Sequence, residues 1–354
     1  MIPPFTYEQL PGRVVFGAGT LDRLPDEVAR LGARRAIVLS TPEQAEVAND
    51  VARRLGDGSA GVFAQAVMHV PIETARAARE EARRLDADCA VAVGGGSTIG
   101  LGKAIALDSG LPIIAVPTTY AGSEMTPIYG LTEGGLKKTG RDRRVLPRTV
   151  IYDPTLTFTL PAALSATSGM NAIAHCVEAL YAIDANPIVS MWAEDGIRAL
   201  AASLPVIVAA PQDLAARTQA QYGAWLAGAS LGAVGMALHH KLCHTLGGTF
   251  NLPHAETHTI VLPHASAYNR AAAPEAMARV SRAVGGGDAA QGLHDLAKSL
   301  GAPVALRALG LKETDLDRAA DIATREPYPN PRLVDRAGVR RLLQDAWAGS
   351  PPAM

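Results

Sequence analysis

Amide and imidazole side chains recur at helical spacing in this 354-residue chain. In SGMNAIAHCVEALYA, residues 168–182, Asn171 and His175 are one turn apart and share a face of a predicted helix. An aspartate at position 171 would make this pair half of a metal site, because carboxylates and imidazoles are common ligands of divalent cations. Whether a metal is bound therefore decides the chemistry.

A second group of imidazoles lies in HHKLCHTLGGTFNLPHAETHTIVLPH, which begins at position 239 and ends at position 264. His240 and His244 share a helix face, and His254 follows a glycine-containing break beside Pro253, so it can fold back toward them. Several converging imidazoles favour a catalytic site over isolated core histidines. Of the other histidines, two are predicted to be structural and two have no assigned role: His258 and His264, then His69 and His294.

Three consecutive glycines, Gly94, Gly95 and Gly96, follow a buried strand in AVAVGGGSTIGLGKAIAL and precede a helix predicted to begin near Ser97 or Thr98. Such a junction offers close backbone approach, free amides and a helix N-terminus, which suit a pyrophosphate. The triplet is not GxGxxG, and glycines can also be plain turn residues at this place. We predict that this loop, together with Ser97 and Thr98, binds a nicotinamide dinucleotide.

Polar side chains also follow the next strand, in AVPTTYAGSEMTP. The carboxyl edge of a parallel sheet is where open α/β folds bind ligands, so these residues are expected beside the glycine loop. The residues predicted to bind the cofactor there are Thr118, Thr119, Ser123 and Thr126, and Tyr120 is predicted to contact substrate.

The strand RAIVLS ends at Ser40 and Thr41, where a nicotinamide-binding protein often has an acid that bonds the adenosine ribose. A carboxylate there would repel the extra phosphate of NADPH. Because Ser40 and Thr41 carry no charge, both are predicted cofactor contacts, and NADH and NADPH are both expected to be usable.

The elements that must position these residues fall into two parts. Up to about residue 157, short β-branched strands alternate with amphipathic helices, which predicts a parallel Rossmann-like sheet with helices on both faces. From residue 158 to 354 the pattern is Ala- and Leu-rich and predicts an all-α domain. The polar stretch at residues 132–147 reads as an exposed hairpin or loop.

Composition excludes several classes of protein. The 33 basic and 34 acidic residues nearly cancel, which argues against nucleic-acid or membrane-surface partners. No apolar run reaches membrane-spanning length and no signal peptide is recognisable, so a cytoplasmic protein is expected. Cys89, Cys176 and Cys243 are widely spaced among apolar residues, as reduced buried thiols would be.

Over nearly its whole length the chain resembles the iron-containing alcohol dehydrogenase superfamily. The resemblance rests on seven stretches: FGAGTLDRL, GGGSTIGLGK, PTTYAGSEMT, IYDPTLTFTLP, GMNAIAHCVEALYA, HHKLCHTLGGTFNLPHA and NPR at residues 330–332. It implies the dehydroquinate synthase-like fold, a homodimer, and an Asp and three His that bind a divalent metal. The matching positions here are Asn171, His175, His240 and His254.

Three departures from that pattern resemble the maleylacetate reductase branch of the superfamily. Asn171 replaces the carboxylate, Gly100 stands where an Asp is usual, and PTTYAGSE is one residue shorter than the usual loop. The branch does not require a metal, so no metal is expected. The resemblance implies NAD(P)H-dependent reduction of maleylacetate to 3-oxoadipate in aromatic-compound degradation, in a cleft between the domains. In a simpler alternative, Asn171 only bonds a neighbouring helix.

The implied chemistry assigns roles to the histidines. Hydride addition beside the ketone produces an enolate, which His240, His244 and His254 are predicted to stabilise or protonate, while His175 and Asn171 orient the substrate. Two substrate carboxylates need cations, for which Arg76 and Lys103 are predicted to face the cleft, with Arg332 as a third choice. Each cation could instead be a solvated surface charge.

Three rival functions follow from the same residues. A metal-dependent alcohol dehydrogenase that tolerates Asn171 would contain zinc or iron and lose activity in chelator. A lyase related to dehydroquinate synthase would return NAD unchanged and consume no NADH overall. A noncatalytic nucleotide-binding module would leave the imidazoles unexplained.

Overall fold

The computed structural model describes residues 5–8, 10, 12–134 and 136–353, which fall into two compact units. The N-terminal unit ends at Leu160, close to the predicted boundary at 157, and the C-terminal unit begins at Pro161. Residues 5–8 differ from the prediction because they group with the C-terminal unit. The ring of Tyr7 packs edge-on against Trp192 at 5.9 Å between centroids, which accounts for the difference.

A six-stranded parallel sheet forms the centre of the N-terminal unit, in the order β1-β8-β5-β4-β2-β3. Its strands are β1 (Arg13–Phe16), β2 (Ala36–Leu39), β3 (Ser59–Phe63), β4 (Cys89–Gly94), β5 (Ile113–Pro117) and β8 (Thr149–Tyr152). The predicted parallel sheet is confirmed. β3 was not predicted from the sequence.

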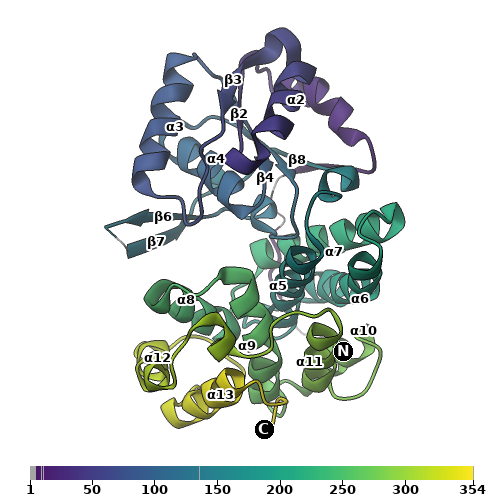
Figure 1. The fold of residues 1–354 in the computed structure, drawn as a ribbon, viewed down its shortest axis with the longest axis vertical. Helices are drawn as coiled ribbons and strands as arrows, with labels where there is room; N and C mark the ends of the chain where they lie inside the picture. Colours follow the sequence, from purple (N-terminus) through teal and green to yellow (C-terminus); the bar gives the residue numbers. More distant parts are fainter. Residues whose placement is uncertain (1–4, 9, 11, 135, 354) are drawn as a thin grey trace. The chain divides into compact units, whose positions relative to one another are not determined.

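Helices cover both faces of this sheet (Figure 1). They are α1 (Leu24–Arg30), α2 (Ala45–Leu55), α3 (Ile72–Arg84) and α4 (Gly96–Ser109). Successive strand residues point to opposite faces, so Val38 packs with α1 and α2 while Ile37 and Leu39 pack with α3 and α4. Both faces of each central strand are therefore apolar, as parallel sheets require.

A separate antiparallel hairpin lies within residues 128–141 of the same unit. It consists of β6 (Ile128–Glu133) and β7 (Leu136–Arg141), which overlap the stretch predicted to be a hairpin or loop. Thr132 of β6 bridges to Pro71, and its amide bonds the carbonyl of Val70 at 3.1 Å. The hairpin is thus attached to the loop that precedes α3.

The C-terminal unit contains only helices within its described residues. They are α5 (Ala162–Leu180), α6 (Pro187–Ala209), α7 (Leu214–Ala233), α8 (Leu238–Phe250), α9 (His254–Asn269), α10 (Pro274–Ala283), α11 (Ala289–Ser299), α12 (Leu316–Ala323) and α13 (Arg336–Ala348). None of the helices in the described parts of the chain is both long and apolar enough to span a membrane.

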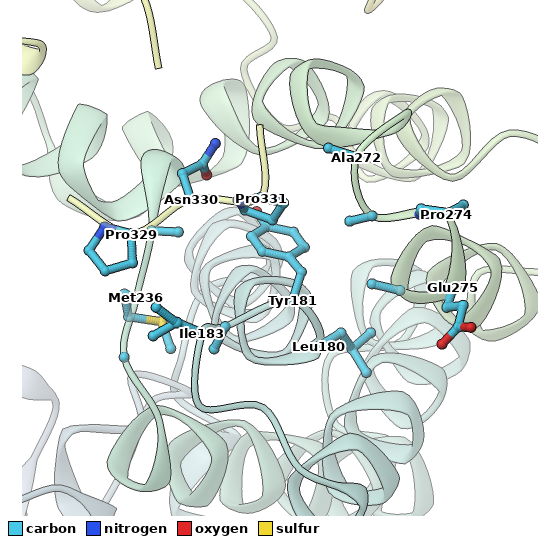
Figure 2. A pocket seen from close by; sticks show the side chains of 15 residues that line it. Leu180, Tyr181, Ile183, Met236, Ala272, Pro274, Glu275, Pro329, Asn330 and Pro331 are labelled. Carbon is cyan, nitrogen blue, oxygen red and sulfur yellow. The ribbon is translucent and has the colours of Figure 1, made fainter. Parts of the chain in front are cut away.

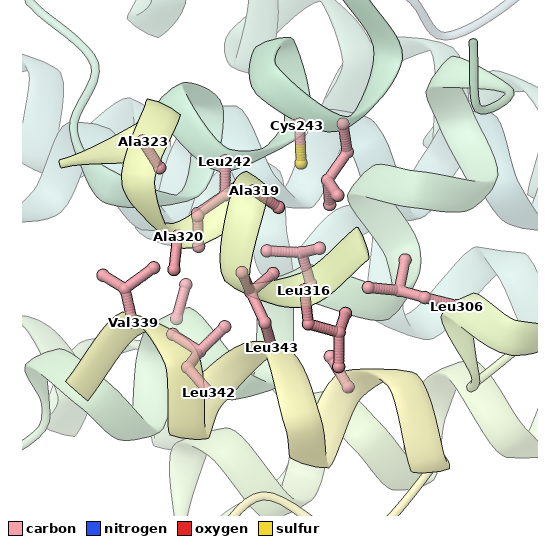
Figure 3. Packing of buried hydrophobic residues seen from close by; sticks show 14 of the residues in the cluster. Leu242, Cys243, Leu306, Leu316, Ala319, Ala320, Ala323, Val339, Leu342 and Leu343 are labelled. Carbon is pink, nitrogen blue, oxygen red and sulfur yellow. The ribbon is translucent and has the colours of Figure 1, made fainter. Parts of the chain in front are cut away.

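A buried apolar cluster fixes the helix that carries most of the histidines (Figure 3). Leu242 and Cys243 of α8 pack with Leu316 of α12 and with Leu342 and Leu343 of α13. Buried aliphatic side chains of this size each contribute about 1.5–3 kcal/mol to folding. The apolar face of α8 therefore anchors the helix and leaves its imidazole face for other contacts.

Candidate active site

The glycine loop and the second polar loop meet at one edge of the sheet, as predicted. Gly94 and Pro117 are paired residues of β4 and β5, and the amide of Thr118 bonds the carbonyl of Gly94 at 3.1 Å. Helix α4 begins at Gly96, one residue before the earlier of the two predicted starts. Its first amides have no acceptor within the helix, as at any helix N-terminus.

Only glycine fits at Gly94. Its φ is 154°, and a Cβ there would lie 2.4 Å from Oγ1 of Thr98 and 2.9 Å from Oε1 of Gln44. At Gly95 a Cβ would lie 3.0 Å from the Thr119 side chain, whereas at Gly96 it would make an ordinary contact. The hydroxyl of Thr98 is buried with no hydrogen-bond partner among the described residues. Bare backbone beside an unpaired hydroxyl fits a bound dinucleotide.

Gln44 is a residue of this edge that the sequence analysis missed. It lies in the short 3₁₀ turn Pro42–Gln44 after β2, and its amide donates to Oγ1 of Thr118 at 2.9 Å. Ser40 is buried and its hydroxyl donates to the carbonyl of Thr41. Nothing in the sequence distinguishes Gln44 from an ordinary turn residue, because its partner is 74 positions away.

The prediction that Lys103 binds substrate needs correction. Its side chain is fully buried, and Nζ donates to the carbonyls of Ser123, Thr126 and Ile128 at 2.7–2.8 Å and to Oγ1 of Thr126 at 3.0 Å. We call this arrangement the lysine cage. Burial lowers the pKa of Lys103 to about 7, while the charge of Glu124 opposes that shift. The ammonium links the loop after β5 to α4, and its N–H groups all donate within the protein, so none remains for a substrate.

The cage also uses groups that were assigned to the cofactor. The Ser123 carbonyl and the Thr126 hydroxyl and carbonyl accept from Lys103, so these groups hold the loop in place. Tyr120 is fully buried, and its contact with substrate stays a prediction. Direct cofactor contacts of Ser123 and Thr126 also stay predictions.

The other two cations differ from Lys103 and from each other. Arg76 has 66% of its side chain exposed and lies 3.6 Å from Glu133 on the hairpin, a solvent-screened pair. Arg332 stacks on the Tyr268 ring, 4.0 Å from its centroid, and donates to the Tyr268 carbonyl at 3.3 Å. Arg332 is thus engaged within its own unit, and Arg76 stays a prediction.

Gly100 has a packing reason of its own. A Cβ at this position would lie 2.9 Å from Cγ2 of Val70. Val70 has a φ of 45° and His69 a φ of 66°, which are unusual for residues other than glycine and especially for a β-branched one. The hairpin holds this loop, since Thr132 donates its hydroxyl to the His69 carbonyl at 2.8 Å. The loop occupies the space that a side chain at position 100 would need.

The predicted imidazoles gather in the C-terminal unit. The rings of His175 on α5 and His240 on α8 stack at 5.1 Å between centroids, and those of His240 and His244 lie 6.1 Å apart. His254 begins α9, with its ring 4.2 Å from that of His258. We call six residues the histidine cluster: His175, His239, His240, His244, His254 and His258.

Two members of the cluster were not predicted as site residues. His258 was predicted to be structural, yet its ring lies 5.0 Å from that of His240 and 4.8 Å from that of His239. His239 bonds the His258 carbonyl through Nε2 at 3.1 Å. The four-residue spacing from His254 to His258 on α9 was the available signal, because it places both on one face. His264, by contrast, makes no ring contact with the cluster among the described residues, and it is buried elsewhere on α9.

Several buried polar atoms of Asn171 and of the histidine cluster lack hydrogen-bond partners among the described residues. They are Oδ1 of Asn171, Nδ1 of His175, Nε2 of His240 and both ring nitrogens of His258. Burial, together with the neighbouring imidazoles, holds the pKa of His175, His240 and His258 well below the usual value. The rings are therefore neutral at pH 7, and their unpaired atoms are suited to a ligand's polar groups. Among the residues that the structure describes, Oδ1 of Asn171 makes no bond to a neighbouring helix.

The four family metal positions fit a divalent ion poorly. Asn171 supplies a neutral amide oxygen where the family has a carboxylate, so the site lacks a negative charge that would hold the cation. The one set of three candidate ligand atoms within 4.8 Å of one another in the described chain is His239, His240 and His258. It shares only His240 with the family positions.

A cavity of about 580 Å³ opens in the same unit (Figure 2). Tyr181, Ile183, Met236, Pro274 and Asn330 are among its lining residues. None of the predicted site residues lines it. Its lining is mostly apolar and lacks the cations that a dicarboxylate needs, so the histidine cluster is the better candidate site.

Comparison with known proteins gives consistent matches along the chain. The family described as iron-containing alcohol dehydrogenase matches residues 11–154, and its C-terminal counterpart matches residues 165–347. The chain is 60% identical to the maleylacetate reductase of Burkholderia cepacia over 349 residues, or 99% of both chains.

Solved structures agree with these matches. The crystal structure of maleylacetate reductase from Agrobacterium tumefaciens has a TM-score of 0.97 and 54% identity, covering 99% of this chain and all of that one. For the enzyme from Rhizobium sp. strain MTP-10005 the TM-score is 0.96 and the identity 53%, with the same coverage. The likeness extends over both units of the chain.

Proposed function

Because this chain belongs to the iron-containing alcohol dehydrogenase family, we propose that it reduces maleylacetate to 3-oxoadipate with NADH or NADPH as the reductant. The observation that carries the proposal is 60% identity to a maleylacetate reductase along 99% of both chains. The unpaired polar atoms around Asn171 and His175 support it, because they offer a buried site for a polar ligand.

The reaction is a reduction of a carbon–carbon double bond conjugated to a ketone. The bound nicotinamide supplies a hydride to the alkene carbon β to the ketone. Electron density then moves to the ketone oxygen as an enolate, and one proton from an acid finally reaches the α-carbon. One reduced nicotinamide and one proton are consumed for each 3-oxoadipate formed.

The chain's own residues must stabilise that enolate. A neutral imidazole presents one N–H donor, and hydrogen bonds to developing charge in a water-poor site contribute several kcal/mol. His244 and His254 are the proposed hydrogen-bond donors and His240 the proposed carrier of the proton, with His175 and Asn171 orienting the substrate. His258 joins this group because both of its ring nitrogens lack protein partners among the described residues.

The glycine loop and the turn after β2 hold the cofactor in this proposal. Ser40 and Thr41 place no carboxylate at the end of β2, so neither NADH nor NADPH meets repulsion from these two residues. The Michaelis constants of the two cofactors should therefore be comparable. A preference for NADH of roughly a thousandfold or more would contradict this part.

We propose further that turnover needs no metal, because Asn171 offers a neutral amide where the family's metal site has a carboxylate, and an amide suits hydrogen bonding better than coordination. The test is NADH oxidation by metal-stripped protein in chelator with maleylacetate as substrate. Retained turnover is expected. Loss of turnover that zinc or iron restores would favour a metal-dependent dehydrogenase, and product without net NADH oxidation would favour the lyase.

The environment of the protein is also a proposal. All three cysteines are buried free thiols, and burial raises the pKa of Cys89 to about 12, so they are inert and suit a reducing cytoplasm. A homodimer with no nucleic-acid or membrane partner is proposed. Light scattering of the purified protein tests the subunit number.

A further inference from the structure

Glu178 is a fully buried carboxylate that lies on α5, three residues after His175. Its Oε1 accepts from the amide of His239 at 2.8 Å and from the hydroxyl of Tyr181 at 3.3 Å. Its Oε2 accepts from the amide of Ala237 at 2.8 Å, from the amide of His240 at 3.3 Å and from Nδ1 of His240 at 2.7 Å. Five donors therefore converge on one side chain.

Three of these bonds begin helix α8. The helix has Ala237 at its N-cap, and no side chain caps it there. The first amides of a helix need acceptors, and a negative charge near them is favourable. Glu178 supplies both from a different helix, so the position of α8 depends on α5.

The bond to His240 has a chemical consequence. A carboxylate can only accept, so Nδ1 of His240 must carry the hydrogen in this 2.7 Å bond. In the neutral ring, Nε2 then has the lone pair, and this buried atom has no partner among the described residues. Stacking on His175 at 5.1 Å restrains the ring plane. Both the tautomer and the direction of His240 are thereby fixed.

We propose that Glu178 is a positioning residue for the reduction, which holds His240 as the Nδ1–H tautomer and leaves Nε2 as the only ring nitrogen that can contact substrate. The proposal rests on the proposed function. It also separates His240 from the other histidines of the cluster, because its ring must first take up a solvent proton at Nε2, and the carboxylate on the far nitrogen balances the charge of the protonated ring. Delivery of that proton from Nε2 to the α-carbon of the enolate returns His240 to the neutral Nδ1–H form.

The first experiment needs no substrate. Two-bond ¹H–¹⁵N spectra of the full-length protein labelled in histidine report the tautomer of each ring, and a His240→Gln spectrum assigns the signal. We expect an Nδ1–H ring for His240 in the free protein. An Nε2–H ring would overturn the proposal whatever the substrate proves to be.

The second experiment separates positioning from a purely structural role. Glu178→Gln keeps the size of the side chain but puts an amide group where one oxygen accepts, so kcat with maleylacetate should fall by roughly 10–100-fold while KM changes little. Tyr181→Phe is the matched control, because it removes another bond to Glu178 and leaves His240 untouched. It should keep its kcat.

A double variant completes the test. If Glu178 acts through His240, adding Glu178→Gln to His240→Gln should lower kcat no further. Additive losses, or an unchanged kcat in the single Glu178→Gln variant, would overturn the proposal. Should Glu178→Gln not fold, the tautomer spectrum decides. Wild-type protein that shows the Nδ1–H ring but does not reduce maleylacetate would instead refute the proposed function.

Discussion

The lysine cage and the histidine cluster bury polar groups to a similar depth but treat them in opposite ways. In the cage, the ammonium of Lys103 has four acceptors within 3.0 Å. In the cluster and at the neighbouring Asn171, several buried atoms lack partners among the described residues. They include Oδ1 of Asn171, Nε2 of His240 and both nitrogens of His258. An unpaired buried polar group costs about 1–3 kcal/mol, whereas a paired one is close to neutral. The cage is therefore structural, whereas the unpaired atoms of the cluster support the proposed ligand site.

The largest expected effect is acid destabilisation through the buried histidines, both those of the cluster and His264. Burial lowers the pKa of His239 and His264 to about 4, and lowers those of His175, His240 and His258 well below 6.5. Below about pH 6.5 the unfolded chain binds protons that the folded chain does not, so stability falls as pH falls. Each histidine should contribute roughly 1 kcal/mol per pH unit down to its folded pKa.

Urea unfolding at several pH values between about 7 and 5 measures this slope. His264→Asn should make the slope shallower by one histidine's share, because it removes one group with a lowered pKa. A free energy of unfolding that stays flat over this range would mean that the imidazoles are already charged in the folded protein. The contrast with the lysine cage would then fail.

Next in size is the loss of an imidazole from the cluster. His240→Ala should lower kcat by about 10²–10⁴-fold, the usual contribution of a group that transfers protons. His264→Asn serves as the control, since this buried histidine lies outside the cluster and should keep its kcat. Steady-state kinetics with maleylacetate provide the measurement. Full activity of both His240→Ala and His254→Ala would remove the cluster from the mechanism.

Substitution of Lys103 in the lysine cage should lower the free energy of unfolding and should not act on the chemical step. Lys103→Met removes the donor from three carbonyls and a hydroxyl, so the free energy of unfolding should fall by about 3 kcal/mol. Lys138→Met, at an exposed ion pair with Glu133, should change it by less than about 0.5 kcal/mol. Equal small effects in denaturant would show that the cage does not support the loop.

The smallest effect concerns the glycine loop. Gly94→Ala places a Cβ 2.4 Å from the Thr98 hydroxyl at a φ of 154°, a strain of about 1–3 kcal/mol. If that strain displaces the loop, the KM for NADH should rise by roughly 10–100-fold. Gly102→Ala, on helix α4 after the loop, makes only ordinary contacts and should retain its KM. Unchanged cofactor kinetics in Gly94→Ala would argue that the nucleotide binds elsewhere.

The sequence predicted the sheet and the helical unit well, because strand–helix alternation is a local signal. It missed β3, whose sequence SAGVF starts with three small residues and has little apolar pattern. It also placed residues 5–8 in the wrong unit, since their attachment depends on a ring contact with Trp192, 185 positions after Tyr7. Contacts over such separations leave no periodic trace in the sequence.

The site was predicted only in part, again because some of its contacts join residues far apart in the sequence. Helical spacing brought His240 and His244 together correctly, but the direction of Lys103 depends on a loop some 20 residues further along the chain. Glu178 follows His175 by one turn, yet its partners are about 60 positions away on α8. Its importance becomes visible only when two helices are placed together.

The close approach of Gly100 and Val70 limits how this protein can have changed over time. An acidic side chain at position 100 would occupy the space of the Val70 methyl group, and Val70 cannot retreat while the hairpin holds its carbonyl. An acidic residue at position 100 therefore also requires a change in the segment around Val70.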